Sequence, residues 1–80
     1  MTLTDINKEL KKIIAKGGTS RERYKEIEVF GHYLYNKGEI SEEGWFSLLE
    51  RGRKLLGIEK RRILLDGTRD IYRSELIFPE

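Results

Sequence analysis

The chain contains no cysteine, and His32 is its only histidine. A disulfide and a thiolate zinc site are therefore excluded, and a metal site of the usual His/Cys type would need a second chain. Glu42-Glu43 is a carboxylate pair, but it falls at the start of a predicted helix, and 80 residues leave little room for a catalytic cleft. We therefore expect a protein that is not an enzyme and that holds no cofactor.

Glutamine is also absent, and asparagine occurs only at Asn7 and Asn36. Few thermolabile amides beside many Lys, Glu and Arg residues are typical of hyperthermophile proteins, so we hypothesise a thermophilic source, archaeal or viral. No apolar run reaches the length needed to span a membrane, and the N-terminus lacks the apolar core of a signal peptide. We expect a cytoplasmic protein without a membrane partner.

The length predicts a single domain over residues 1–80, because chains divide into several domains only well beyond this size. Charged and apolar residues each make up 38% of the chain. This balance is highly charged for a globular domain but too apolar for a disordered one. We therefore expect a folded domain with one modest core.

Apolar residues spaced for one helix face predict a first helix from about Asp5 to Lys16, capped by Thr4 and ended by Gly17. Thr19 and Glu22 have the spacing of a capping box, which predicts a second helix from near Ser20 to about Asn36. This second helix is apolar on two sides, since Val29 and Tyr33 lie opposite its main apolar face. Such a helix is either central in its domain or covered by a partner.

Lys37-Gly38 is typical of a helix C-cap, and Ser41 is typical of the next N-cap. The third helix is predicted from Glu42 to Leu56, closed by Gly57. Phe46 falls on its charged side, which indicates either a satellite core residue or a contact residue.

Beyond Gly57 the apolar residues come in pairs, and Asp66-Gly67 is a strong hairpin signal. We predict strands near Arg61–Leu65 and Thr68–Tyr72, with Ile63, Leu65 and Ile71 as candidates for the buried side. The sequence leaves a fourth helix open as the alternative for this region. Residues 76–78 are expected to form either a tail packed on the core or an added edge strand. The fold class is therefore α+β, a three-helix domain followed by a C-terminal β-hairpin, with an all-α four-helix domain as the alternative.

The net charge of +2 is too small to indicate a partner, but residues 51–73 contain eight basic and three acidic residues. Arginine suits bidentate contact with phosphate, so this segment is a candidate nucleic-acid surface. Its basic residues are Arg51, Arg53, Lys54, Lys60, Arg61, Arg62, Arg69 and Arg73. The opposing interpretation is that these side chains pair with neighbouring acids on a solvated surface.

The corner NKGEISEE (36–43) followed by RRILLDGTRDIYR (61–73) resembles, in the order of its elements, the winged helix-turn-helix family of DNA-binding transcription regulators. This resemblance implies a helix in the major groove, with arginines of the hairpin on phosphates or in the minor groove. The first functional hypothesis is therefore a small regulator that binds DNA or RNA through its basic C-terminal segment.

The second hypothesis is a regulator or inhibitor that binds a larger protein complex. Val29, Tyr33 and Phe46 are apolar residues outside the main helix faces, and arginines and aromatic residues of this kind are enriched in protein interfaces. A homodimer is also possible. The sequence leaves the two hypotheses open.

Overall fold

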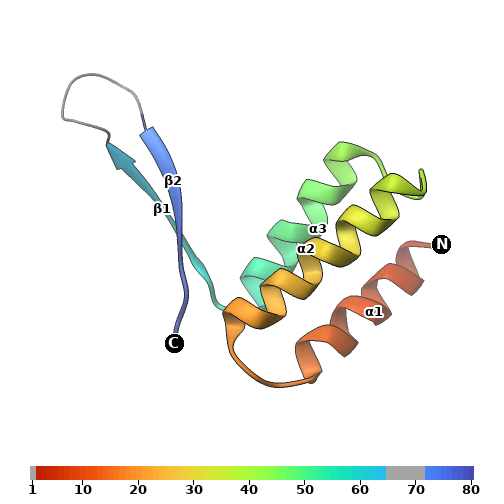
Figure 1. Cartoon of the computed structure of the whole chain (residues 1–80), viewed down its shortest axis with the longest axis horizontal. Helices are drawn as coiled ribbons and strands as arrows, with labels where there is room; N and C mark the ends of the chain where they lie inside the picture. Colours follow the sequence, from red (N-terminus) through yellow and green to blue (C-terminus); the bar gives the residue numbers. More distant parts are fainter. Residues whose placement is uncertain (1, 65–71) are drawn as a thin grey trace.

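The computed structural model describes residues 2–64 and 72–80, which form three helices followed by two strands. The elements are α1 (Leu3–Ala15), α2 (Ser20–Asn36), α3 (Glu42–Leu55), β1 (Glu59–Leu64) and β2 (Tyr72–Ile77). The two strands form an antiparallel hairpin (Figure 1). The predicted α+β class is confirmed, and the all-α alternative is wrong.

The helix caps follow local sequence signals in α2 and α3. The backbone N–H of Glu22 donates to Thr19 Oγ1, and that of Gly44 donates to Ser41 Oγ, each over 3.1 Å. At the end of α2, Gly38 adopts a φ of 74° and its N–H donates to Tyr35, while the N–H of Glu39 donates to Leu34. These two bonds form a Schellman motif, which requires the left-handed conformation that glycine adopts without strain.

The prediction that Thr4 caps α1 is wrong, because the helix begins at Leu3 and Thr2 is its cap. The reason is the position of Asp5, three residues after Thr2. Its backbone N–H donates to Thr2 Oγ1 over 3.2 Å, and its carboxylate accepts from the Thr2 N–H over 3.3 Å. Thr4 has no acidic residue at the same spacing, so only Thr2 can form this reciprocal capping box.

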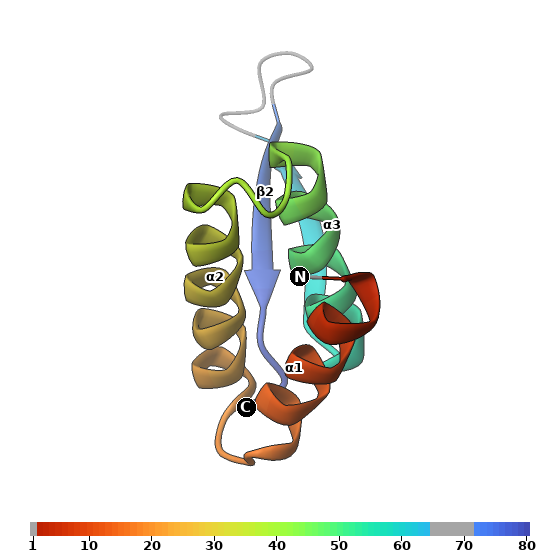
Figure 2. The same cartoon turned by 90° about the vertical axis from the view of Figure 1, so that its right-hand side faces the viewer.

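The helices pack around one small core. Its buried members come from all three helices, and the largest fully buried side chains are Ile27 and Leu34 on α2 and Leu48 on α3. Ile6, Leu10 and Ile13 extend the core along α1. Figures 1 and 2 show α2 and α3 side by side, with α1 on one side of this pair and the hairpin on the other.

Two glycines set how closely α2 and α3 approach. A Cβ added to Gly31 on α2 would lie 2.6 Å from Nε1 of Trp45 on α3. A Cβ added to Gly52 on α3 would lie 2.6 Å from Cδ1 of Ile27 on α2. Each helix therefore lacks a side chain where the other presents a large one. The absence of a side chain at Gly31 and Gly52 allows this close crossing of the two helices.

The register of the hairpin places Glu59 opposite Ile77 and Leu64 opposite Tyr72. The first predicted strand overlaps β1, which begins two residues earlier, at Glu59. Of the second predicted strand only Tyr72 is described, because residues 68–71 lie outside the described part of the chain, and β2 extends beyond the predicted end to Ile77. A two-residue turn at Asp66-Gly67 would instead have placed Leu64 opposite residue 69, and the turn itself lies outside the described residues. Leu76 and Ile77, the apolar residues at the end of β2, explain this difference in register. They pair with Lys60 and Glu59 near the core instead of forming a separate tail.

The base of the hairpin is fixed to the helices on both strands. Before β1, Ile58 is buried, and its carbonyl accepts from Arg53 over 2.8 Å. After β2, the ring of Phe78 meets that of Tyr24 edge to face, with centroids 6.3 Å apart. Ile63, a predicted core residue, is half-buried, whereas Leu65 and Ile71 lie outside the described residues.

Glu80 completes this attachment at the N-terminus of α2. Its carboxylate accepts from the Ser20 backbone N–H over 2.5 Å and from the Ser20 hydroxyl over 2.6 Å. The bond from the Ser20 hydroxyl is the main cause that lowers the pKa of Glu80 below its usual range. A carboxylate at this position also interacts favourably with the helix dipole.

We predict that Gly52→Ala destabilises the domain by about 1–3 kcal/mol, because its methyl group would overlap Ile27 and outweigh the higher helix propensity of alanine. Urea unfolding measures the free energy. Gly44→Ala is the matched control, since its Cβ would lie 3.4 Å from its nearest neighbours. An unchanged stability of Gly52→Ala would contradict the close approach of the two helices.

We predict that Glu80→Gln lowers the melting temperature at neutral pH but not at strongly acidic pH. A carboxylate whose pKa is lowered by folding stabilises the protein above the pKa it has in the unfolded chain. That contribution is lost as the pH falls through the folded pKa, so the melting curves of variant and wild type should converge. Glu28→Gln, at an exposed position, is the control. An equal effect of both substitutions would show that Glu80 makes no specific contribution.

Candidate interaction surfaces

Four aromatic rings meet where α2 ends and α3 begins. The Trp45 ring lies 5.3 Å from that of His32, 5.4 Å from that of Tyr35 and 6.2 Å from that of Phe46, measured between centroids. We call these four residues the aromatic face. The short corner between the helices brings the last turns of α2 beside the first turns of α3, and Gly31 leaves the space in which Trp45 lies against α2.

The rings of the aromatic face differ in exposure. Trp45 is half-buried, whereas Phe46 is 54% exposed and Tyr35 is 41% exposed. Nε1 of Trp45 is buried and has no hydrogen-bond partner among the described residues. The indole is therefore held by its ring contacts, beneath more exposed rings. Exposed aromatic side chains around a fixed one are typical of the centre of a protein interface.

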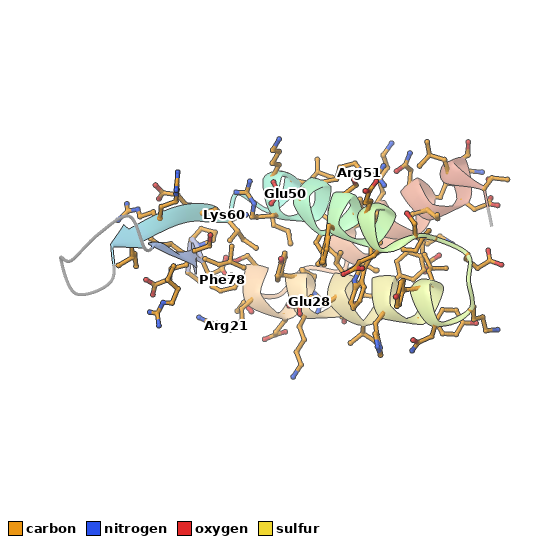
Figure 3. The ribbon with its side chains drawn as sticks, turned by 90° about the horizontal axis from the view of Figure 1, so that it is seen from above. Arg21, Glu28, Glu50, Arg51, Lys60 and Phe78 are labelled. Atoms are coloured by element: carbon orange, nitrogen blue, oxygen red, sulfur yellow. The ribbon has the colours of Figure 1, made fainter. Side chains whose placement is uncertain are left out.

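The aromatic face lies on the hairpin side of the α2–α3 pair. Tyr24 on α2 contacts Phe78, and Glu50 on α3 lies 3.9 Å from Lys60, so both residues mark that side. His32 follows Tyr24 by eight residues and Phe46 precedes Glu50 by four, spacings that return to the same side of a helix. Figure 3 shows Glu50 near Lys60, and Arg21 near Phe78, at the base of the hairpin.

Acidic residues flank the aromatic face. Glu28 and Glu42 are exposed, and within residues 2–64 and 72–80 neither has an ion-pair partner. Glu28 lies one helical turn before His32, and Glu42 lies one turn before Trp45 and Phe46.

Glu50 differs from these two acids because it is already paired. Arg53 contacts its carboxylate over 3.0 Å, and this hydrogen bond is the main cause that lowers the pKa of Glu50. On the same side of the molecule, burial is the main cause that raises the pKa of Tyr24, followed by the charges of Glu28 and Glu50. In the described part of the chain, Glu28 and Glu42 are therefore the unpaired acids beside the aromatic face.

Val29 and Tyr33 do not join Phe46, although all three were predicted as one protein-binding set. They line a shallow groove of about 660 Å³ between α1 and α2, with Ile13 and Phe30 also in its lining. This groove is on the α1 side of α2, and the aromatic face is on the hairpin side. The apolar stripe at Val29 and Tyr33 is exposed at 63% and 52%, so within the described structure no other element covers it.

The predicted basic residues of the hairpin divide between its two faces. Strand alternation and the observed register place Arg61 and Arg73 on one face, and Lys60 and Arg62 on the other. Arg61 donates to Glu59 over 3.1 Å, so part of its charge is compensated. Arg69 lies outside the described residues.

The basic residues of α3 also contact different parts of the molecule. Arg51 donates to Asn7 on α1, and Arg53 is bound to Glu50 and to the Ile58 carbonyl. Lys54 is exposed and lines a hollow between α1 and α3. The predicted nucleic-acid residues are therefore not assembled on one described surface.

The arrangement of α2 and α3 limits the likeness to a winged helix-turn-helix domain to element order. The two helices run alongside each other in opposite directions (Figures 1 and 2), whereas the helices of a helix-turn-helix cross at about 90–120°. Glu42 and Glu43 occupy the exposed first turn of α3, where carboxylates would repel a phosphate backbone.

Of the aromatic face, only Phe46 was predicted from the sequence as a site residue, and His32, Tyr35 and Trp45 were missed. The sequence did contain one signal for this group, the short connection between α2 and α3. Residues a few positions before and after a short connection between two antiparallel helices lie close together.

Among the described residues, no group of three or more His, Cys, Asp or Glu side chains could hold a metal ion. Their helices include none that is both long and apolar enough to cross a membrane. Comparisons of the chain with known protein families, with curated proteins and with solved structures find no match.

We predict that Trp45→Ala costs about 3–5 kcal/mol of stability, because it removes the ring that fills the space left by Gly31. Phe46→Ala should cost about 1 kcal/mol, the contribution of one aromatic contact on an exposed side chain. Guanidinium unfolding followed by circular dichroism measures both. Equal losses for the two variants would contradict the anchoring role of Trp45.

Proposed function

We propose that this protein is a small, non-catalytic binding module whose aromatic face takes a basic segment of a partner protein. One observation carries the proposal: four contacting rings, one fixed against Gly31 and the others exposed, form a single surface with unpaired acids beside it. Apolar side chains of a partner would contact the rings. Its Lys or Arg residues would face Glu28 and Glu42.

The chemistry of the aromatic face favours a cationic partner. Lysine and arginine are attracted to the faces of Trp, Tyr and Phe rings, and this attraction grows as the site loses water. Complementary charges at the rim raise the association rate and exclude acidic partners. A nucleic-acid backbone is acidic, so the same surface would repel it.

Nucleic-acid binding has less support. It needs several cations on one surface, whereas the described basic residues lie on two hairpin faces and along α3. Arg51, Arg53 and Arg61 are moreover hydrogen-bonded within the chain. Regulation of transcription or of a larger complex remains compatible with the proposed module, since a protein-binding domain can act on either.

We predict that peptides selected from a random displayed library for binding to the purified chain combine apolar residues with Lys or Arg. In a spectrum of isotope-labelled protein, such a peptide should shift the signals of His32, Tyr35 and Phe46. Phe46→Ala should weaken binding at least tenfold, equivalent to about 1.4 kcal/mol, because it removes an exposed interface ring.

Tyr33→Ala is the matched control, since it removes an aromatic side chain from the α1–α2 groove. A selection whose binders lose affinity with Tyr33→Ala but not with Phe46→Ala would contradict the proposed surface. Labelled duplex DNA, titrated at low and moderate salt, tests the other hypothesis. Tight binding that falls steeply with salt would favour a nucleic-acid function instead.

A further inference from the structure

The hairpin has an outer edge on each of its strands. Two strands alone are marginally stable in water and gain stability from a third strand or from a covering helix. Contacts with the helices are concentrated at its base, where Lys60 and Phe78 lie (Figures 1 and 3). Farther along, the side chains of Arg73, Ser74 and Glu75 on β2 are exposed.

The two edges carry different charge patterns. Along β1, Lys60, Arg61 and Arg62 follow one another, so two β1 strands side by side would place cations against cations. Along β2, Arg73 and Glu75 flank Ser74 symmetrically. In Figure 2, β1 lies on one side of β2 only, and none of the described backbone hydrogen bonds outside the elements involves β2.

The charges on β2 lack partners within the described chain. Arg61 stands opposite Glu75 in the register, but its guanidinium is bonded to Glu59 on its own strand, with Nε 3.1 Å from Oε1. Ile63 stands opposite Arg73. Within the described residues, Arg73 and Glu75 therefore form no ion pair, although both are charged and lie on one face of the hairpin.

We propose that the β2 edge binds the β2 edge of a second copy of this chain, antiparallel and centred on Ser74. In this register Arg73 faces the partner's Glu75, and Glu75 faces the partner's Arg73. A two-fold axis through the Ser74 pair relates the copies, as an isologous interface requires. The product is a four-stranded sheet in the order β1-β2-β2-β1, which removes both free β2 edges.

Other registers of the same pairing are unfavourable. Only residues on the same face of a sheet stand opposite each other, so the register can change only in steps of two residues. A shift in one direction places Arg73 opposite the partner's Arg73, and a shift in the other places Glu75 opposite the partner's Glu75. Like charges directly opposite each other destabilise a pair of strands. The charge pattern therefore selects the Ser74-centred register.

The test uses two charge-reversal variants, and sedimentation equilibrium of the full chain measures their association. Wild type should be a dimer. Arg73→Glu alone places only acids along the interface, and Glu75→Arg alone places only bases there. Each should weaken dimerisation roughly tenfold to a hundredfold. An equimolar mixture of the two should restore the dimer, because every acid then faces a base, and the double variant R73E/E75R should dimerise by itself.

Arg61→Gln is the control on β1, because it removes a charge from the same face of the hairpin without placing an acid opposite Glu75. The proposed interface leaves its dimerisation unchanged. A wild type that stays monomeric at millimolar concentration would overturn the proposal. So would single variants that dimerise as well as wild type, or a mixture no more dimeric than its components. Isotope-filtered spectra of mixed labelled and unlabelled wild type give a second readout that needs no variant. Contacts between copies at Ser74 support the proposal, and contacts confined to another surface contradict it.

Discussion

The close approach of α2 and α3 at two glycines is the constraint on which the rest of the structure depends. Gly31 leaves space for Trp45, and Gly52 leaves space for Ile27, so each helix receives a large side chain from the other. The buried Ile27 is a central member of the core, and the chain is too short to form a second core. The position of Trp45 in turn brings the rings of Tyr35 and Phe46 together at the surface.

The position of the hairpin depends on contacts that begin at the end of α3. Arg53 binds the carbonyl of Ile58, the buried residue that leads into β1, and Phe78 returns to Tyr24 after β2. These contacts fix the base of the hairpin and direct its strands away from the helices (Figure 1). The aromatic face and the β2 edge are thus separate surfaces, and the partner proposed for one does not depend on the partner proposed for the other.

Features controlled by neighbours in sequence could be predicted. Thr19, Gly38 and Ser41 determine helix ends through bonds spanning only a few residues, and their roles are confirmed. Thr2 was missed because two threonines compete at the start of α1, and the position of Asp5 decides between them. The predicted extent of the hairpin was wrong because the register depends on burial beside Ile58. Such burial is a tertiary effect that local sequence signals do not encode.

The grouping of site residues depends on packing and therefore could not be obtained from periodicity. Val29 and Phe46 both lie off the main apolar faces, yet they occur on opposite sides of α2 and α3. Basic residues that are contiguous in β1 alternate between two faces of the hairpin. A segment that is strongly basic in sequence is thus divided in space.

The position of Trp45 is tested most directly by proton contacts in a nuclear Overhauser spectrum of the folded chain in solution. The structure predicts contacts from the indole Hδ1 and Hε1 protons of Trp45 to the Gly31 Hα protons, together with contacts from the indole to the Tyr35 ring. It also predicts that the ring current of Trp45 displaces the Gly31 Hα signals from their ordinary positions. Gly31 signals at ordinary positions, without contacts to Trp45, would contradict the helix packing and the aromatic face that depends on it.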